Sequence, residues 1–97
     1  MKHYDIGDRV RITGTLTSPE TGQPVDPTNL QITIRDPAGN TTTLQYGTDP
    51  EVVRDDTGIY HVDIDVTTRG QWHYRFAATG VNTAAAEGTF YANPSHF

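Results

Sequence analysis

The chain has 97 residues, 34% of them hydrophobic, and a formal net charge of −5 from 12 acidic and 7 basic residues. This length predicts a single domain with one modest core, and the acidic balance with scattered Lys and Arg argues against a nucleic-acid-binding surface. The absence of cysteine excludes disulfides and thiolate metal sites.

The N-terminus MKHYDIGDRV lacks the apolar run of a signal peptide, and no stretch approaches the roughly 18 apolar residues of a membrane span. We therefore expect the protein to start at its own Met1 and to have no membrane partner. Residues 1–8 form a lead-in to the first regular strand. Residues 9–16 alternate apolar and polar side chains, which predicts a half-buried strand. Gly14 lies on the apolar face of that strand, where a glycine marks a bulge or a close approach.

Residues 17–29, TSPETGQPVDPTN, form a polar loop that contains three of the six prolines. A loop of this length in a compact domain is either a binding surface or a tolerated connector. Both interpretations stay open, and Pro24 and Val25 are its candidate partner contacts.

The middle of the chain reads as short strands separated by turns. Residues 30–35 alternate strictly, and the turn at 36–40 contains Pro37 and Gly39, which favour turn backbone angles. A Thr-rich strand at 41–46 and a short strand at 51–54 follow.

Residues 55–76 contain the clearest pattern, because two alternating segments flank the short sequence TTRG. This arrangement predicts an antiparallel hairpin. The expected apolar pairs are Val66–Trp72, Ile64–Tyr74 and Val62–Phe76. The expected polar pairs are Asp65–His73 and Asp63–Arg75.

The last predicted strand covers residues 84–92, and NPSHF at 93–97 forms a tail interrupted by Pro94. No segment has the helical repeat of apolar residues. We therefore predict one all-β domain over residues 1–92, an antiparallel two-sheet sandwich of about seven strands, followed by a tail at 93–97.

The sequence DDTGIYHV resembles the Asp-x-Gly-x-Tyr-x-Cys motif of immunoglobulin-like domains, with Asp56, Gly58 and Tyr60 in place and Val62 at the cysteine position. The resemblance implies an immunoglobulin-like sandwich in which Tyr60 acts as a corner tyrosine. Its hydroxyl would then bond to upstream backbone.

Several short pieces spread over the chain are similar to filamin-like and macroglobulin-like sandwich modules, namely YDIGDRVRI, DPAG, GIY and GQWHY. The ensemble with RDPAGN, AAAEGTFY and the final PSHF resembles small uncharacterised structural proteins of tailed bacteriophages and prophages. That resemblance implies a virion component, made in the host bacterial cytoplasm, with no cofactor and no catalytic residues to carry over.

Two metal hypotheses compete with an ordinary solvated surface. His61, His73 and His96, with Asp63 and Asp65, would have to converge to bind zinc, yet cross-strand charge pairs explain the same residues. An acidic group lacks the spacing of a calcium loop; its members are Asp49, Glu51, Asp55 and Asp56. We predict no metal site.

Enzymatic activity is not expected. The two serines, Ser18 and Ser95, both stand beside proline and away from any His–Asp arrangement. Trp72 is either a sugar-stacking platform or a core residue, and its place in the alternation favours the core. His96 and Phe97 end the chain either as a frayed tail or as an anchor in a neighbouring subunit.

These observations lead to a non-enzymatic virion structural protein that decorates the capsid or joins head, neck and tail. Its predicted partners are other virion proteins, and the chain itself as a homo-oligomer or multicopy array. The alternative is an adhesion or carbohydrate-binding module on the same fold, using the loop at 17–29.

Overall fold

A computed structural model of the chain describes residues 2–80 and 84–94, and within this part it contains eight strands and no helix. None of the described residues therefore belongs to a helix that could cross a membrane. The strands are β1 (Lys2–Asp5), β2 (Arg9–Thr15), β3 (Asn29–Arg35), β4 (Thr41–Gln45), β5 (Val52–Asp56), β6 (Ile59–Asp65), β7 (Gly70–Thr79) and β8 (Ala84–Asn93).

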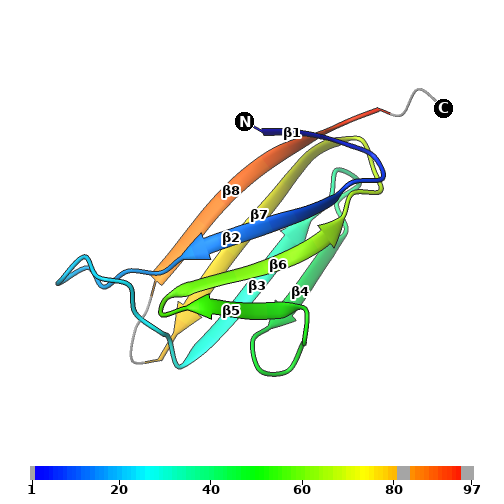
Figure 1. Cartoon of the computed structure of the whole chain (residues 1–97). Coiled ribbons are helices and arrows are strands. Elements are labelled where there is room, and N and C mark those ends of the chain that lie inside the picture. Colours follow the sequence, from blue (N-terminus) through cyan, green and yellow to red (C-terminus); the bar gives the residue numbers. More distant parts are fainter. Residues whose placement is uncertain (1, 81–83, 95–97) are drawn as a thin grey trace.

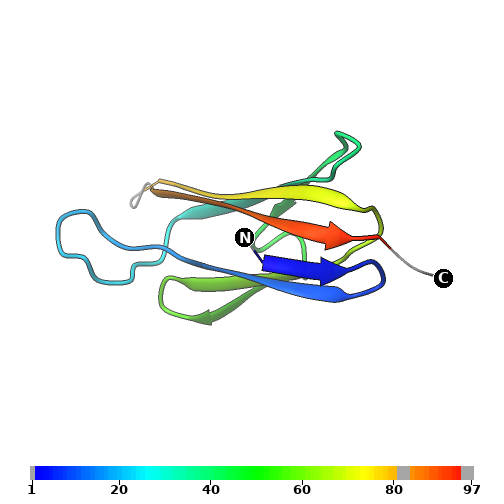
Figure 2. The same ribbon diagram turned by 90° about the horizontal axis from the view of Figure 1, so that it is seen from above.

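The strands form a two-layer sandwich (Figures 1 and 2). One sheet has five strands in the order β1-β8-β7-β3-β4, and the other has three in the order β2-β6-β5. All neighbours are antiparallel except β1 and β8, which run parallel. The all-β sandwich predicted from alternation is confirmed, with eight strands where about seven were expected. The prediction that all neighbouring strands are antiparallel is wrong for β1 and β8, at one edge of the five-stranded sheet.

The predicted hairpin between β6 and β7 is wrong, because these strands belong to different sheets. β6 pairs with β2 and β5, and β7 pairs with β3 and β8. Alternation identifies the buried face of a strand but not its partner strand. Strands of two facing sheets that cover the same core show the same alternation of apolar and polar residues. The actual pairs of the expected residues are Val62–Ile12, Ile64–Val10, Trp72–Phe90, Tyr74–Gly88 and Phe76–Ala86.

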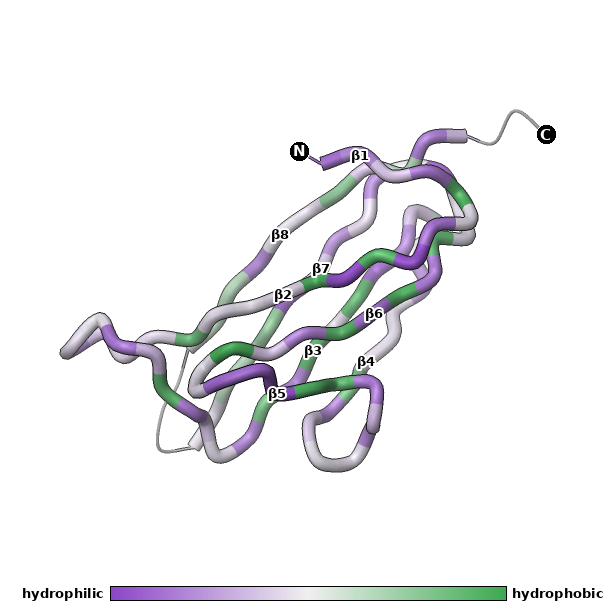
Figure 3. The backbone as a smooth tube through the Cα atoms, viewed as in Figure 1, coloured by the Kyte–Doolittle hydropathy of each residue, from purple (hydrophilic) through white to green (hydrophobic). Residues whose placement is uncertain are grey.

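The core lies between the sheets and takes every second residue of the central strands (Figure 3). Ile32, Val62 and Phe76 have no exposed surface, and Trp72 is only 6% exposed. The predicted placement of Trp72 in the core is therefore confirmed. It stacks on Phe90 with ring centroids 5.6 Å apart, and its indole Nε1 donates a hydrogen bond to the Thr68 carbonyl (2.9 Å).

β8 extends one residue further than predicted. Asn93, which the sequence placed in the tail, pairs with Asp5 of β1. The Asn93 carbonyl accepts a hydrogen bond from the Ile6 amide (3.4 Å). Pro94 is the last described residue, so the predicted contacts of His96 and Phe97 lie outside the described part.

Gly14 on β2 is a point of close approach between the sheets, one of the two roles predicted for it. A Cβ atom at this position would lie 2.6 Å from Cδ2 of the buried Phe76 ring. We expect Gly14→Ala to lower the free energy of unfolding by about 1–3 kcal/mol, because the ring must move within a packed core. Urea denaturation followed by tryptophan fluorescence measures this loss.

The matched variant is Thr13→Ala on the same strand, whose side chain is exposed. It should change the free energy of unfolding by less than about 0.5 kcal/mol. Equal stability of Gly14→Ala and the wild type would show that the two sheets do not need glycine to approach here.

Candidate functional site

The most distinctive surface feature is a projection from one end of the sandwich, between β2 and β3 (Figures 1 and 2). Residues 17–24, here called the arm, fold back on themselves through an isolated bridge between Thr17 and Pro24. Within the arm, the Ser18 amide donates to the Gln23 carbonyl (2.9 Å), and the Gly22 amide donates to the Ser18 carbonyl (2.8 Å). The arm thus has its own hydrogen bonds and is more than a slack connector.

Leu16 and Val25, which flank the arm, form its neck, and the neck is hydrogen-bonded to the turn between β5 and β6. The Leu16 amide donates to the Gly58 carbonyl (2.7 Å), and the Val25 amide donates to the Leu16 carbonyl (3.0 Å). A Cβ on Gly58 would lie 2.6 Å from the Leu16 oxygen, and this residue also has a positive φ of 72°. Glycine is required here both for its backbone angle and for space.

Asp26, just after the arm, is the polar centre of this end of the sandwich. Its Oδ1 accepts hydrogen bonds from the Gly58 amide (2.8 Å), the Tyr60 hydroxyl (3.0 Å) and Arg54 Nε (3.2 Å). Its Oδ2 accepts one from Arg54 Nη2 (3.0 Å). A single carboxylate therefore connects the arm to both strands of the β5–β6 hairpin. We call these four residues the Asp26 cluster.

The Asp26 cluster shifts the acidity of its members. The guanidinium of Arg54, followed by the Gly58 amide, lowers the pKa of Asp26 to about 2. Burial, followed by the hydrogen bond to Asp26, raises the pKa of Tyr60 to about 12. The carboxylate is therefore charged and the phenol neutral across the physiological range.

The corner-tyrosine interpretation of Asp56, Gly58 and Tyr60 is wrong. In immunoglobulin domains the corner tyrosine stands at the start of a strand that follows a crossing between sheets. Here the motif forms the turn of a hairpin within one sheet. The Tyr60 hydroxyl bonds to the Asp26 side chain instead of upstream backbone. Asp56 accepts a hydrogen bond from the Thr57 amide (2.7 Å).

The candidate contacts Pro24 and Val25 lie at the neck of the arm. Pro24 is exposed, whereas Val25 is half-buried. The tip consists of residues 18–23, which the sequence did not single out within the loop. Asp26 was also missed, because no local motif reveals that a loop carboxylate meets a tyrosine 34 positions away.

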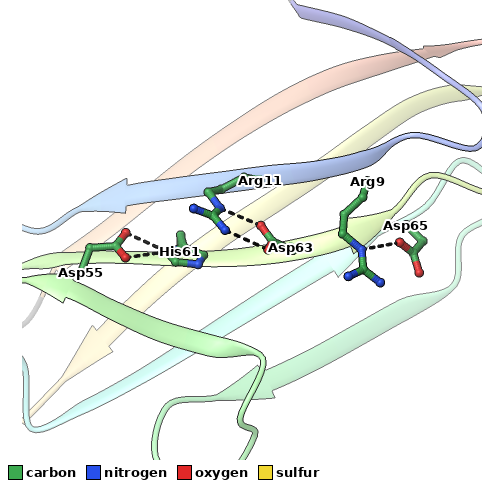
Figure 4. Close-up of polar contacts among 6 residues, drawn as sticks. All are labelled: Arg9, Arg11, Asp55, His61, Asp63 and Asp65. Atoms are coloured by element: carbon green, nitrogen blue, oxygen red, sulfur yellow. Dashed lines mark hydrogen bonds and ion pairs between the residues drawn. The ribbon is translucent and has the colours of Figure 1, made fainter.

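The outer face of the three-stranded sheet carries a row of charge pairs (Figure 4). Arg9 pairs with Asp65 (2.9 Å), and Arg11 pairs with Asp63 (2.9 Å), across β2 and β6. Each arginine lowers the pKa of its aspartate partner. The predicted pairs Asp65–His73 and Asp63–Arg75 are wrong, since β7 lies in the other sheet.

The buried His61 completes this row by bonding through Nδ1 to Asp55 (2.7 Å). It lies in the sheet opposite that of His73, so the two histidines do not converge as a zinc site requires. Asp49 accepts the Gln45 amide instead of joining Asp55 in a calcium loop. Within residues 2–80 and 84–94, no three His, Asp or Glu residues gather as a metal site would need.

The outer face of the five-stranded sheet has an open depression over β3, β7 and β8, here called the hollow. Its charged side chains are Arg35, Arg75 and Glu87, and His73 of β7 is the cross-strand partner of Arg35. Arg75 Nε is 3.6 Å from Glu87 Oε1, a loose and exposed pair. The described residues contain no ion-pair partner for Arg35.

No model of a known protein family matches the sequence, and no curated protein matches it.

Proposed function

We propose that the chain is a non-enzymatic structural protein of a bacteriophage virion, made in the host cytoplasm, which docks on other virion proteins through the arm. The observation that carries this proposal is the arm itself, held away from the sandwich and fixed at its neck by the Asp26 cluster. A preordered projection loses less conformational entropy on docking than a slack loop would. The virion assignment rests on the sequence resemblance to phage structural proteins.

The strand order supports an immunoglobulin-like relationship for the sandwich. β2-β6-β5 facing β8-β7-β3 corresponds to the B-E-D and G-F-C strands of immunoglobulin domains. In this correspondence the arm occupies the B–C loop, one of the loops that antibodies use for recognition. Loops on a rigid scaffold are common binding elements.

The test replaces residues 18–23 with a two-residue Asn-Gly turn in the phage that encodes the protein. We expect the amount of protein that co-sediments with assembled particles to fall at least about tenfold, because the docking element is gone. Quantitative mass spectrometry of purified particles measures both variants. It also gives the copy number: many copies indicate capsid decoration, and about a dozen or fewer indicate the neck or tail.

The purified variant should melt within about 3 °C of the wild type, since the replaced residues lie beyond the Thr17–Pro24 bridge. Thr43→Ala on the exposed face of β4 is the matched surface control and should enter particles normally. If neither the wild type nor the variant co-sediments with particles, the virion role is wrong. If both co-sediment equally, another surface mediates docking.

A further inference from the structure

The tip of the arm carries one charged residue, Glu20. Its amide donates to the Ser18 hydroxyl (3.3 Å), and the residue is exposed. In the part of the chain that the structure describes, its carboxylate has neither a hydrogen bond nor an ion pair. The arm therefore presents a single unpaired negative charge at its outer end.

The hollow presents the opposite charge. Arg35 is exposed and unpaired in the described ranges, and Arg75 is held only loosely by Glu87 at 3.6 Å. The hollow is therefore locally positive on a chain whose net charge is −5. Guanidinium groups bind carboxylates strongly because their donors match the two oxygens.

The arm cannot fill the hollow of its own chain. It precedes Asn29 at the start of β3, whereas Arg35 stands at the other end of that seven-residue strand, roughly 20 Å from Asn29. The arm also points away from the sandwich, beyond the ends of the strands (Figure 2). Any pairing of these two surfaces must therefore join two molecules.

We propose that the arm of one copy docks into the hollow of a second copy, with the Glu20 carboxylate bound to Arg35 and close to Arg75. This inference rests on the proposed function for the role of the arm, and it names the partner as the chain itself. The two surfaces differ, so the contact is heterologous and propagates into a ring or an open row of copies. Glu20 and Arg35 are both unpaired in the described residues and opposite in charge, so a second copy supplies the group that fits the hollow.

Sedimentation equilibrium of the full chain in about 10 mM salt, where screening is weak, tests the contact. We expect concentration-dependent association that weakens at 0.5 M salt. Glu20→Arg and Arg35→Glu should each weaken it about tenfold, because an attractive pair becomes a repulsive one. The double variant Glu20→Arg/Arg35→Glu should return to within about threefold of the wild type.

Glu51→Arg is the control, since it makes the same change in charge at an exposed acidic residue outside the arm. It should leave the association within about twofold of the wild type. A chain that stays monomeric at millimolar concentration would overturn the proposal, and so would a charge swap that restores nothing. Particle incorporation is measured separately, so a protein that enters particles without self-association would keep the proposed function and lose only this contact.

Discussion

Trp72→Ala is expected to lower the free energy of unfolding by about 3–5 kcal/mol, the range found for large aromatic residues removed from a core. The substitution removes the stacking on Phe90 and the indole bond to the Thr68 carbonyl. The free energy of unfolding of a whole native protein is roughly 5–15 kcal/mol, so the variant should be only marginally stable. Urea denaturation followed by far-UV circular dichroism measures the loss, because the variant lacks the only tryptophan of the chain.

Two further variants separate packing from other effects. Trp72→Phe keeps a ring and loses the hydrogen bond, so we expect it to lower the free energy of unfolding by about 1–2 kcal/mol. His73→Ala changes the next residue, whose side chain is exposed on the outer face of β7, and should cost less than about 0.5 kcal/mol. If Trp72→Ala were as mild as His73→Ala, Trp72 would be a surface residue and the sugar-stacking interpretation would return.

Asp26→Ala is expected to cost about 2–3 kcal/mol, although Asp26 lies in a loop and its side chain is 40% exposed. The reason is that the Gly58 amide and the buried Tyr60 hydroxyl lose their acceptor at once. Arg54 loses its ion pair in the same step. Thermal and urea unfolding measure the effect, and Tyr60→Phe in a double-mutant cycle gives the energy of the hydroxyl–carboxylate bond.

The contribution of Asp26 should depend on pH in a defined direction. Its pKa is lowered from 3.8 to about 2 in the folded protein, so its charge stabilises the fold at and above pH 4. That stabilisation is lost as the pH falls from about 4 through the folded-state pKa of about 2, because the carboxylate is protonated in both states only below that value. After allowance for solvent screening, we expect the charge of Asp26 to contribute about 1–1.5 kcal/mol to the free energy of unfolding.

Asp26→Asn keeps the shape of the side chain and removes its charge. The difference in stability between the wild type and Asp26→Asn should therefore be constant from pH 5 to 7 and shrink below pH 4. A difference that stays constant down to pH 2 would mean that the charge of Asp26 is not part of the cluster's strength.

The sequence predicted the faces of the strands better than their partners. Val62 and Phe76 were correctly placed in the core, because period-two alternation reports burial directly. Their pairing with each other was wrong, since a short connection can either turn within one sheet or cross to the other. The difference depends on the whole set of strands competing for partners, which no local pattern contains.

The same limit explains the site. Residues 17–29 stood out as a long Pro-rich loop, yet the role of Asp26 depends on Arg54 and Tyr60, which reach it only through the fold. The hollow likewise combines Arg35 and Arg75 from strands 40 positions apart in the chain. The sequence left two roles for Gly14, a bulge or a close approach, because glycine on an apolar face fits both; the fold decides for the close approach to Phe76.

The parallel pairing of β1 with the end of β8 has a mechanical consequence. Lys2 pairs with Phe90 and Asp5 with Asn93, so the two ends of the chain leave this ladder in opposite directions. Tension applied between the N-terminus and the C-terminus loads the ladder in shear, and its hydrogen bonds must yield together instead of opening one after another. Only after the hydrogen bonds between β1 and β8 have broken is the force transmitted to β2 and β8, which lie in the two facing sheets.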